Sequence, residues 1–282
     1  MRESRWKVCV TAGAVLLSLL IACTPAPSPP VDRFVGDFET GNFDQWANCQ
    51  NVAVSSTPCA DYTDPTDSMR VETSVVRQGE YAARFQVGAG DTPDRICCGA
   101  RAEVSGEDAT RADEGDERWY QWSTRFEHGF PADRGWTVLS QWHAEEDGSP
   151  PLAIAAGPTN VSENHWGIVI STWNAPGDAG PTYTPWSMQL VPDVWNDIKL
   201  HVKWSARDTD GYVELWLGGQ RQTFDASPCA GQLRCSIRTL MPNGGGVYFK
   251  QGYYRDAGIT PLGAVYHDGF SAALSEDALA PL

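Results

Sequence analysis

Apolar and polar residues alternate in short runs along most of the chain, and helical spacing of apolar residues is nearly absent. The runs are rich in Val, Trp and Tyr and are bounded by Gly, Asp, Asn and Pro, a pattern typical of β-strands joined by turns. A hairpin is indicated at Asp210-Gly211. The expected strands are Met69–Thr73, Tyr81–Val87, Gly99–Val104, Arg118–Phe126, Trp136–His143, Leu152–Ala156, Trp166–Ser171, Trp195–Trp204, Tyr212–Leu217, Gly246–Tyr254 and Gly263–Phe270.

Short strands at this spacing, with twelve Trp residues to fill a core, favour an all-β domain of two packed sheets. We expect a β-jelly roll, which is a concanavalin A-like two-sheet sandwich, over residues 34–282. An α/β fold is excluded because no helical segments separate the strands.

The first residues have the pattern of an export signal. A basic start is followed by a mostly apolar run, Val8–Ala22, which is too short for a comfortable membrane span. Leu20-Ile21-Ala22-Cys23 looks like a bacterial lipobox, in which Cys23 is lipidated and becomes the new N-terminus. We therefore predict a signal peptide at 1–22, a Pro-rich tether at 23–33, and a protein held at the bacterial cell envelope by its lipid alone.

The formal net charge is −15, and loss of residues 1–22 would make it more negative, because that segment holds three basic residues and one acidic residue. Such a surface argues against nucleic acid as a partner. No feature of the sequence requires an oligomer, and a monomer is expected.

Cysteine usage fits an exported protein. Apart from Cys9 and Cys23, six cysteines remain, and an even number in an exported chain indicates disulfides. Cys49–Cys59 and Cys229–Cys235 could each close a short loop. Cys97 and Cys98 could pair with each other, or cross-pair with Cys49 or Cys59. Structural zinc is disfavoured, since neither Cys-x-x-Cys nor clustered His accompanies these residues.

Three predicted strands carry polar residues two positions apart. Residues i and i+2 of a strand share one face, so the residues between them point the other way. The intervening Ala102, Trp142 and Phe249 should therefore face the core. Burying the polar set against a second sheet would be costly, so it should form the floor of a groove. The polar positions are Arg101 with Glu103, Gln141 with His143, and Tyr248 with Lys250 and Tyr254.

These segments resemble the three signature motifs of the family seven alginate lyases. They are Arg101-Ala102-Glu103-Val104, Gln141-Trp142-His143 and Tyr248-Phe249-Lys250-Gln251-Gly252-Tyr253-Tyr254, in the family's order. Gly36–Gly41 and Trp195–Trp204 are more similar to the heparin lyase I and glucuronan lyase group, which shares the jelly roll. Trp142 departs from the alginate lyase pattern, which usually has an aliphatic residue there.

The resemblance implies a polysaccharide lyase that cleaves a 4-linked uronate by β-elimination, with no cofactor for the chemistry. Such an enzyme neutralises the uronate carboxylate, removes the C5 proton and protonates the leaving O4. Arg101 and Gln141 are implied at the carboxylate, and a nearby cation should lower the pKa of Tyr254. Either Tyr254 serves as both base and acid, or His143 is the base and Tyr254 the acid. Lys250 and Tyr248 are assigned to substrate positioning, and Glu103 to holding Arg101.

The expected partner is an acidic polysaccharide such as glucuronan, a glycosaminoglycan or alginate. An acidic protein needs a locally basic groove to bind it, and Arg101, Lys250 and Arg255 could supply the charge. Asp37, Glu39 and Asp268 resemble the terminal calcium site of many jelly-roll carbohydrate proteins, and their oxygens suit Ca²⁺.

The sequence also suggests two other functions. A non-catalytic carbohydrate-binding lipoprotein could use Trp142, Trp173 and Trp186 to stack sugar rings, but it would not need the Arg, Gln, His and Tyr set. A laminarinase-type glycoside hydrolase needs paired carboxylates, usually in a strand reading Glu-x-Asp-x-x-Glu, and no such run occurs.

Overall fold

The computed structural model describes residues 33–63, 66–94, 98–146, 148–159 and 161–282. The predicted signal peptide, the lipidation site Cys23 and nearly all of the tether lie outside these residues. Strand β1 begins at Arg33, the last residue of the predicted tether. No helix in the described ranges has the length and apolar character needed to cross a membrane.

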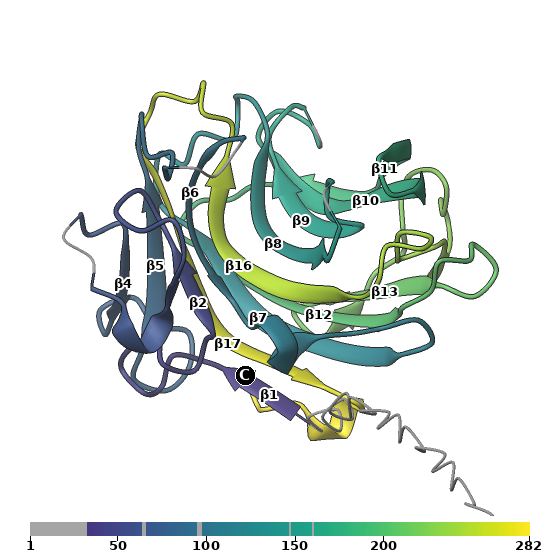
Figure 1. Ribbon diagram of the computed structural model, residues 1–282, viewed down its shortest axis with the longest axis horizontal. Coiled ribbons are helices and arrows are strands. Elements are labelled where there is room, and N and C mark those ends of the chain that lie inside the picture. The colour runs from purple at the N-terminus through teal and green to yellow at the C-terminus, as the bar shows by residue number, and fades with distance from the viewer. Residues whose placement is uncertain (1–32, 64–65, 95–97, 147, 160) are drawn as a thin grey trace, which may run out of the picture. The chain divides into compact units, whose positions relative to one another are not determined.

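Two antiparallel sheets form the structure (Figure 1). The first, sheet A, has the order β14-β13-β12-β7-β17-β5-β4, with β1 paired to β17 and β15 paired to β13. Its strands are β1 (Arg33–Gly36), β4 (Met69–Glu72), β5 (Ala82–Val87), β7 (Glu117–Phe126), β12 (Trp195–Lys203), β13 (Tyr212–Leu217), β14 (Gln220–Arg221), β15 (Cys235–Ser236) and β17 (Gly263–Ala273).

The second, sheet B, has the order β11-β10-β9-β8-β16-β6-β2-β3. Its strands are β2 (Asn48–Gln50), β3 (Thr57–Pro58), β6 (Ala100–Ser105), β8 (Thr137–Ala144), β9 (Leu152–Ala156), β10 (His165–Ala175), β11 (Asp178–Gln189) and β16 (Val247–Arg255). Three short 3-10 helices lie at η1 (Cys59–Asp61), η2 (Glu107–Thr110) and η3 (Glu276–Ala278). The predicted all-β jelly roll is confirmed.

All the expected strands are present, with ends shifted by a few residues. The strands that the pattern did not indicate are mostly short edge or bridging strands such as β2, β3 and β14. Strand β11 is the longer omission. Its residues include Gly180, Pro181 and Pro185, which β-propensity disfavours, and it is tolerated because it lies at the edge of sheet B.

Aromatic side chains from both sheets fill the space between them. Phe249 of β16 stacks on Phe270 of β17, with ring centroids 4.1 Å apart. Trp142 of β8 meets Trp122 of β7 edge to face at 6.1 Å. These rings are fully buried, so they remove large apolar areas from water and fix sheet B on sheet A.

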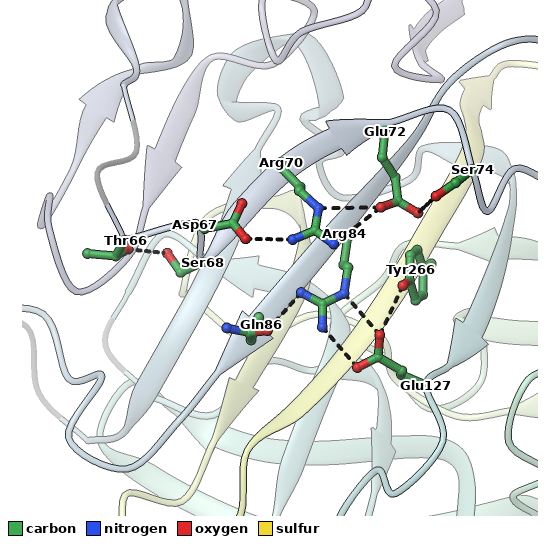
Figure 2. Close-up of polar contacts among 10 residues, drawn as sticks. All are labelled: Thr66, Asp67, Ser68, Arg70, Glu72, Ser74, Arg84, Gln86, Glu127 and Tyr266. Carbon is green, nitrogen blue, oxygen red and sulfur yellow. Dashed lines mark hydrogen bonds and ion pairs between the residues drawn. The ribbon is translucent and has the colours of Figure 1, made fainter.

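The outer face of sheet A carries ion pairs. Arg84 of β5 binds Glu127 through two nitrogens, at 3.1 and 2.9 Å, and Tyr266 of β17 donates its hydroxyl to the same carboxylate (Figure 2). Arg70 and Glu72 of β4 pair beside them. This face is therefore a polar surface with ion pairs both within a strand and between strands.

The structure contains disulfides, as expected, and two of the pairings left open by the sequence are formed. Cys49 pairs with Cys59, and Cys229 pairs with Cys235. Cys98 is also disulfide-bonded, and the pairing of Cys49 with Cys59 rules out a cross-link from either of them to Cys98. Cys97 lies outside the described residues.

Candidate active site

The strand order of sheet B brings the three motif segments together. Strand β16 lies between β6 and β8, so the third motif is flanked by the first and the second. Directly opposed residues of an antiparallel pair share a face. The opposed pairs are Tyr254 with Arg101, Lys250 with Gln141, and Tyr248 with His143.

Strand alternation sends the intervening residues to the other side of the sheet. Ala102, Trp142 and Phe249 are fully buried between the sheets, as predicted. The polar residues of the three motifs therefore lie on the face of sheet B that points away from sheet A.

This face holds a cavity of about 720 Å³. Four predicted site residues line it together: Arg101, Gln141, His143 and Tyr254. Strands β9, β10 and β11 and the Gly148–Pro150 segment form the other side, with small or hydroxyl-bearing side chains such as Ala153, Ala155, Ser171 and Thr182. Among the lining residues that the structure describes, Arg101 is the only one with a permanently charged side chain.

A buried carboxylate organises the floor beneath the cavity. Glu103 accepts hydrogen bonds from Lys250 Nζ at 2.9 Å and from Gln141 Nε2 at 2.6 Å, and Arg101 lies at 3.5 Å. Burial alone would raise the pKa of Glu103. The positive charges of Lys250 and Arg101 outweigh this effect of burial, so the pKa of Glu103 is lowered. Glu103 therefore remains ionised and fixes all three side chains, a wider role than the predicted support of Arg101 alone.

His143 has a defined tautomer. Its Nδ1 lies 2.6 Å from the carbonyl oxygen of Ala144, which can only accept, so Nδ1 carries the proton and Nε2 carries the lone pair. Burial, with Lys250 next in importance, lowers the pKa of His143. The imidazole is therefore neutral at neutral pH and offers Nε2 as an acceptor of a proton.

The expected lowering of the Tyr254 pKa is wrong. Burial raises the pKa of Tyr254, and the opposing effect of Arg101 is smaller. The ring lies under the Arg101 guanidinium on one side and packs edge to face against Trp136, at a centroid distance of 4.7 Å. Tyr254 is consequently a protonated phenol at neutral pH.

The two residues assigned to substrate positioning lie outside the cavity lining. Lys250 Nζ binds Glu103 and, at 2.9 Å, Gln50 Oε1. Tyr248 packs on the His143 ring, with centroids 5.3 Å apart. Both contact residues of the site: Lys250 binds Glu103, and Tyr248 packs against His143.

Arg255 does not contribute charge to the groove. It follows Tyr254 in β16 and therefore points to the opposite face, where it is fully buried and donates to Tyr253 Oη at 3.0 Å and to the Pro261 carbonyl at 2.7 Å. Local basic character at the site comes from Arg101 and Lys250.

The tryptophans proposed as sugar platforms are also buried. Trp142 and Trp186 belong to the main core, and Trp173 packs with Ala144 and Met241. The tryptophan that lines the cavity is Trp136, directly before β8. Trp136 was expected in a strand, but the sequence contains no signal that distinguishes a groove tryptophan from a core tryptophan.

The predicted calcium site is not formed by the residues that the structure describes, which contain no group of three or more His, Cys, Asp or Glu side chains placed to hold a metal. Asp37 accepts from the Glu39 backbone N–H and from Gln45, and Glu39 accepts from the backbone of Glu80 and Tyr81. Asp268 accepts from the backbone of Arg77 and Gln78. Protein N–H groups thus take the place expected for a cation.

Gln50 is a site residue that the sequence did not indicate. It lies on β2, a three-residue strand opposite Glu103 in β6, and reaches Lys250. The neighbouring Cys49–Cys59 disulfide ties this short strand in place. Strand pairing alone brings it to the site, and its local sequence has no strong strand signal.

Comparisons with known proteins agree with this architecture. Similar solved structures include an endo-β-1,4-glucuronan lyase from the fungus Trichoderma reesei, with TM-score 0.61 and 16% identity, covering 86% of this chain and 95% of that chain. An alginate lyase from Corynebacterium sp. has TM-score 0.55 and 14% identity, covering 85% and 99%. A family 7 alginate lyase in complex with a product has TM-score 0.54 and 12% identity, covering 85% and 100%.

A comparison with curated proteins found no match. The family whose model matches is described as "Polysaccharide lyase", and the match runs over residues 38–271. This span contains all three motif segments, all of sheet B and all of sheet A except β1 and the last two residues of β17, and it confirms the resemblance stated from the sequence. The chain belongs to this polysaccharide lyase family and is a polysaccharide lyase.

Proposed function

We propose that the protein cleaves a 4-linked, uronate-containing polysaccharide by β-elimination. One observation carries the proposal: Arg101, Gln141, His143 and Tyr254, from three different strands, line a single cavity. A neutral base, a protonated acid and two donors for a carboxylate then surround one space, and elimination beside a carboxylate needs this set.

Arg101 and Gln141 recognise the uronate carboxylate. The guanidinium supplies charge and several donors. The Gln141 amide nitrogen has two hydrogens; it donates one to Glu103 and can donate the other to substrate. Neutralising the carboxylate makes the adjacent C5 proton more acidic and stabilises the enolate-like transition state.

His143 is the base and Tyr254 is the acid. His143 Nε2 takes the C5 proton, the electrons of that C–H bond form the C4–C5 double bond, and the C4–O4 bond breaks. The Tyr254 hydroxyl gives its proton to the departing O4. Burial supports both roles, because it lowers the pKa of His143 and raises the pKa of Tyr254. The version in which Tyr254 serves as both base and acid is disfavoured, since it requires an ionised phenol.

The substrate class is an acidic polysaccharide such as glucuronan, a glycosaminoglycan or alginate. Support comes from the cavity, where one cation, Arg101, can match one carboxylate. The names of the structural neighbours, a glucuronan lyase and alginate lyases, point to the same chemistry. The net charge of −15 opposes long-range attraction of a polyanion, so binding must rest on contacts inside the cavity.

The test is a panel of glucuronan, glycosaminoglycans and alginate, with the ultraviolet absorbance of the unsaturated uronate as the readout. The parent, a Tyr254→Phe variant and a Tyr212→Phe variant are compared. We expect at least one polymer to give rising absorbance with the parent, and Tyr254→Phe to lose about 10²- to 10⁴-fold in kcat. Tyr212→Phe removes a hydroxyl that binds Glu117 on sheet A, outside the cavity lining, and should retain most activity.

If the parent protein produced no rise in absorbance with any uronate polymer, the proposal would be rejected. Equal activity of Tyr254→Phe and the parent would reject Tyr254 as the acid, even if cleavage occurred.

We further propose that the protein is exported and held at the bacterial envelope by a lipid on Cys23. Support comes from the apolar run that ends in Leu20-Ile21-Ala22-Cys23 and from the prolines that follow. Radiolabelled fatty acid should label the parent expressed in a bacterium, and Cys23→Ser should lose both the label and membrane association. A labelled Cys23→Ser variant would contradict the assignment.

A further inference from the structure

A buried histidine outside the cavity bridges the two sheets. His267 of β17 is fully buried and lies in the interior between sheet A and sheet B. One ring nitrogen, Nδ1, lies 3.0 Å from Thr124 Oγ1 on β7. The other, Nε2, lies 2.9 Å from the carbonyl oxygen of Gly252 on β16. The imidazole therefore connects the core of sheet A to the strand that carries Tyr254.

The direction of each hydrogen bond is fixed. The Gly252 carbonyl can only accept, so Nε2 carries the proton and donates it. Nδ1 then accepts from the Thr124 hydroxyl, whose oxygen accepts from the Trp122 indole N–H at 3.0 Å. Burial lowers the pKa of His267 to about 4, which keeps the ring neutral and this directed chain intact at neutral pH.

Gly252 stands at an irregular point of β16. The register between β16 and β8 shifts between Gln251 and Tyr254, while the pairing of β16 with β6 continues without interruption. The Gly252 φ is +150°, and a Cβ at this position would collide with the carbonyl oxygen of Ala102. The Gly252 backbone therefore leaves the regular hydrogen-bond ladder with β8, and its carbonyl oxygen accepts a hydrogen bond from His267 instead.

Tyr254 follows two residues later. Its ring lies against Arg101 and Trp136 and lines the cavity. The direction in which the ring projects depends on the backbone conformation at the irregular point, and the His267 N–H contacts the backbone there from the opposite sheet.

We propose that His267 is a positioning residue for the elimination: its Nε2–H holds the Gly252 carbonyl and thereby fixes the backbone from which Tyr254 reaches the leaving oxygen. This inference rests on the proposed function and assigns a role to a residue outside the cavity. It differs from that of an ordinary satisfied core histidine, which would affect stability alone.

The test separates positioning from stability with three variants of the full chain. His267→Gln keeps an N–H donor near the position of Nε2. His267→Leu removes the donor and keeps an apolar side chain. Phe85→Leu is the matched control, because Phe85 packs on the His267 ring at a centroid distance of 5.6 Å but makes no hydrogen bond to Gly252. kcat, KM and Tm are measured on a polymer that the parent cleaves, at a temperature where each variant is folded.

We expect His267→Leu to lose about 10- to 100-fold in kcat with little change in KM, the effect of misplacing a catalytic group by a fraction of an ångström. His267→Gln should recover most of that loss, and Phe85→Leu should lower Tm without a comparable loss of kcat. A His267→Leu kcat within twofold of the Phe85→Leu kcat, or a His267→Gln kcat as low as that of His267→Leu, would overturn the proposal.

A measurement on the parent alone keeps the inference testable if His267→Leu does not fold. NMR of imidazole-labelled protein should show an Nε2-bound proton in slow exchange with water, and a rapidly exchanging or Nδ1-bound proton would overturn the hydrogen bond. This signal does not depend on turnover, so it is distinct from failure of the proposed function, which the polysaccharide panel tests.

Discussion

The guanidinium carbon of Arg101 lies 3.9 Å from the centroid of the Tyr254 ring. The two residues are opposed across β6 and β16, so the sheet itself sets this stack. Burial raises the pKa of Tyr254, and Arg101 only partly offsets the effect. The stack therefore orients a protonated phenol next to the donor that would hold the substrate carboxylate.

Replacing Arg101 by Lys keeps the charge but removes the planar group. We expect kcat/KM to fall about 10²-fold, because an ammonium neither stacks on Tyr254 in the same way nor offers the forked donors of a guanidinium. Steady-state kinetics on a cleaved polymer would measure this. The matched control is Arg134→Lys, an exposed arginine outside the cavity lining. Equal kinetics for the two variants would contradict a role for the Arg101 stack.

Replacing Lys250 by Met should move the acid limb of the activity profile to higher pH. The positive charge of Lys250 helps burial to lower the pKa of His143, so its removal raises that pKa. Because a base must be unprotonated to act, activity would be lost at a higher pH than in the parent. The pH dependence of kcat would show the shift.

Lys203→Met is the control for this shift, since it makes the same substitution on β12 of the other sheet. An unchanged acid limb in Lys250→Met, or the same shift in Lys203→Met, would argue against His143 as the base.

Replacing Glu103 by Gln should destabilise the fold by about 3–5 kcal/mol, because the change leaves the buried Lys250 charge without its carboxylate partner. Urea unfolding would measure the loss. Adding Lys250→Met to this variant should recover part of it, since the unpaired charge is then gone. Glu72→Gln, which breaks a partly exposed pair with Arg70 (Figure 2), should cost no more than about 1 kcal/mol. Similar losses for Glu72→Gln and Glu103→Gln would contradict the assigned burial of the network.

Replacing Asp268 by Asn should change how stability depends on pH. Burial raises the pKa of Asp268 to about 6 from the ordinary value of 3.8. The folded protein then binds the proton more tightly than the unfolded chain, so this contribution to stability is fully present below about pH 4 and is lost as pH rises towards 6. The parent should therefore lose about 2 kcal/mol relative to Asp268→Asn between about pH 4.5 and about pH 7.

Urea unfolding of both proteins at the two pH values gives this difference directly, because contributions of the other carboxyls are common to both and cancel. A constant difference between the parent and Asp268→Asn across this range would show that Asp268 titrates normally.

Strand alternation accounts for most of what could be predicted about the site. The spacing of two between Arg101 and Glu103, and between Gln141 and His143, places each pair on one face, and the residues between them are buried. The same rule would have sent Arg255 inward, because it follows Tyr254 directly. The motif order indicated which faces belong together, and the structure brings these faces to one cavity.

The sequence by itself determined the all-β class, most of the longer strands, the presence of disulfides and the polar faces of three strands, because alternation of polar and apolar residues is a local property of the chain. Only the tertiary structure decided that Gln50 accepts a hydrogen bond from Lys250 and that Trp136 is the tryptophan lining the cavity. It also decided that backbone N–H groups donate to Asp268 and that His267 donates to the Gly252 carbonyl. Those relationships depend on strand register and on contact between the two sheets. The tertiary structure also sets the pKa of Tyr254, because burial of the phenol outweighs the neighbouring charge of Arg101. Residue spacing along the chain does not reveal this burial.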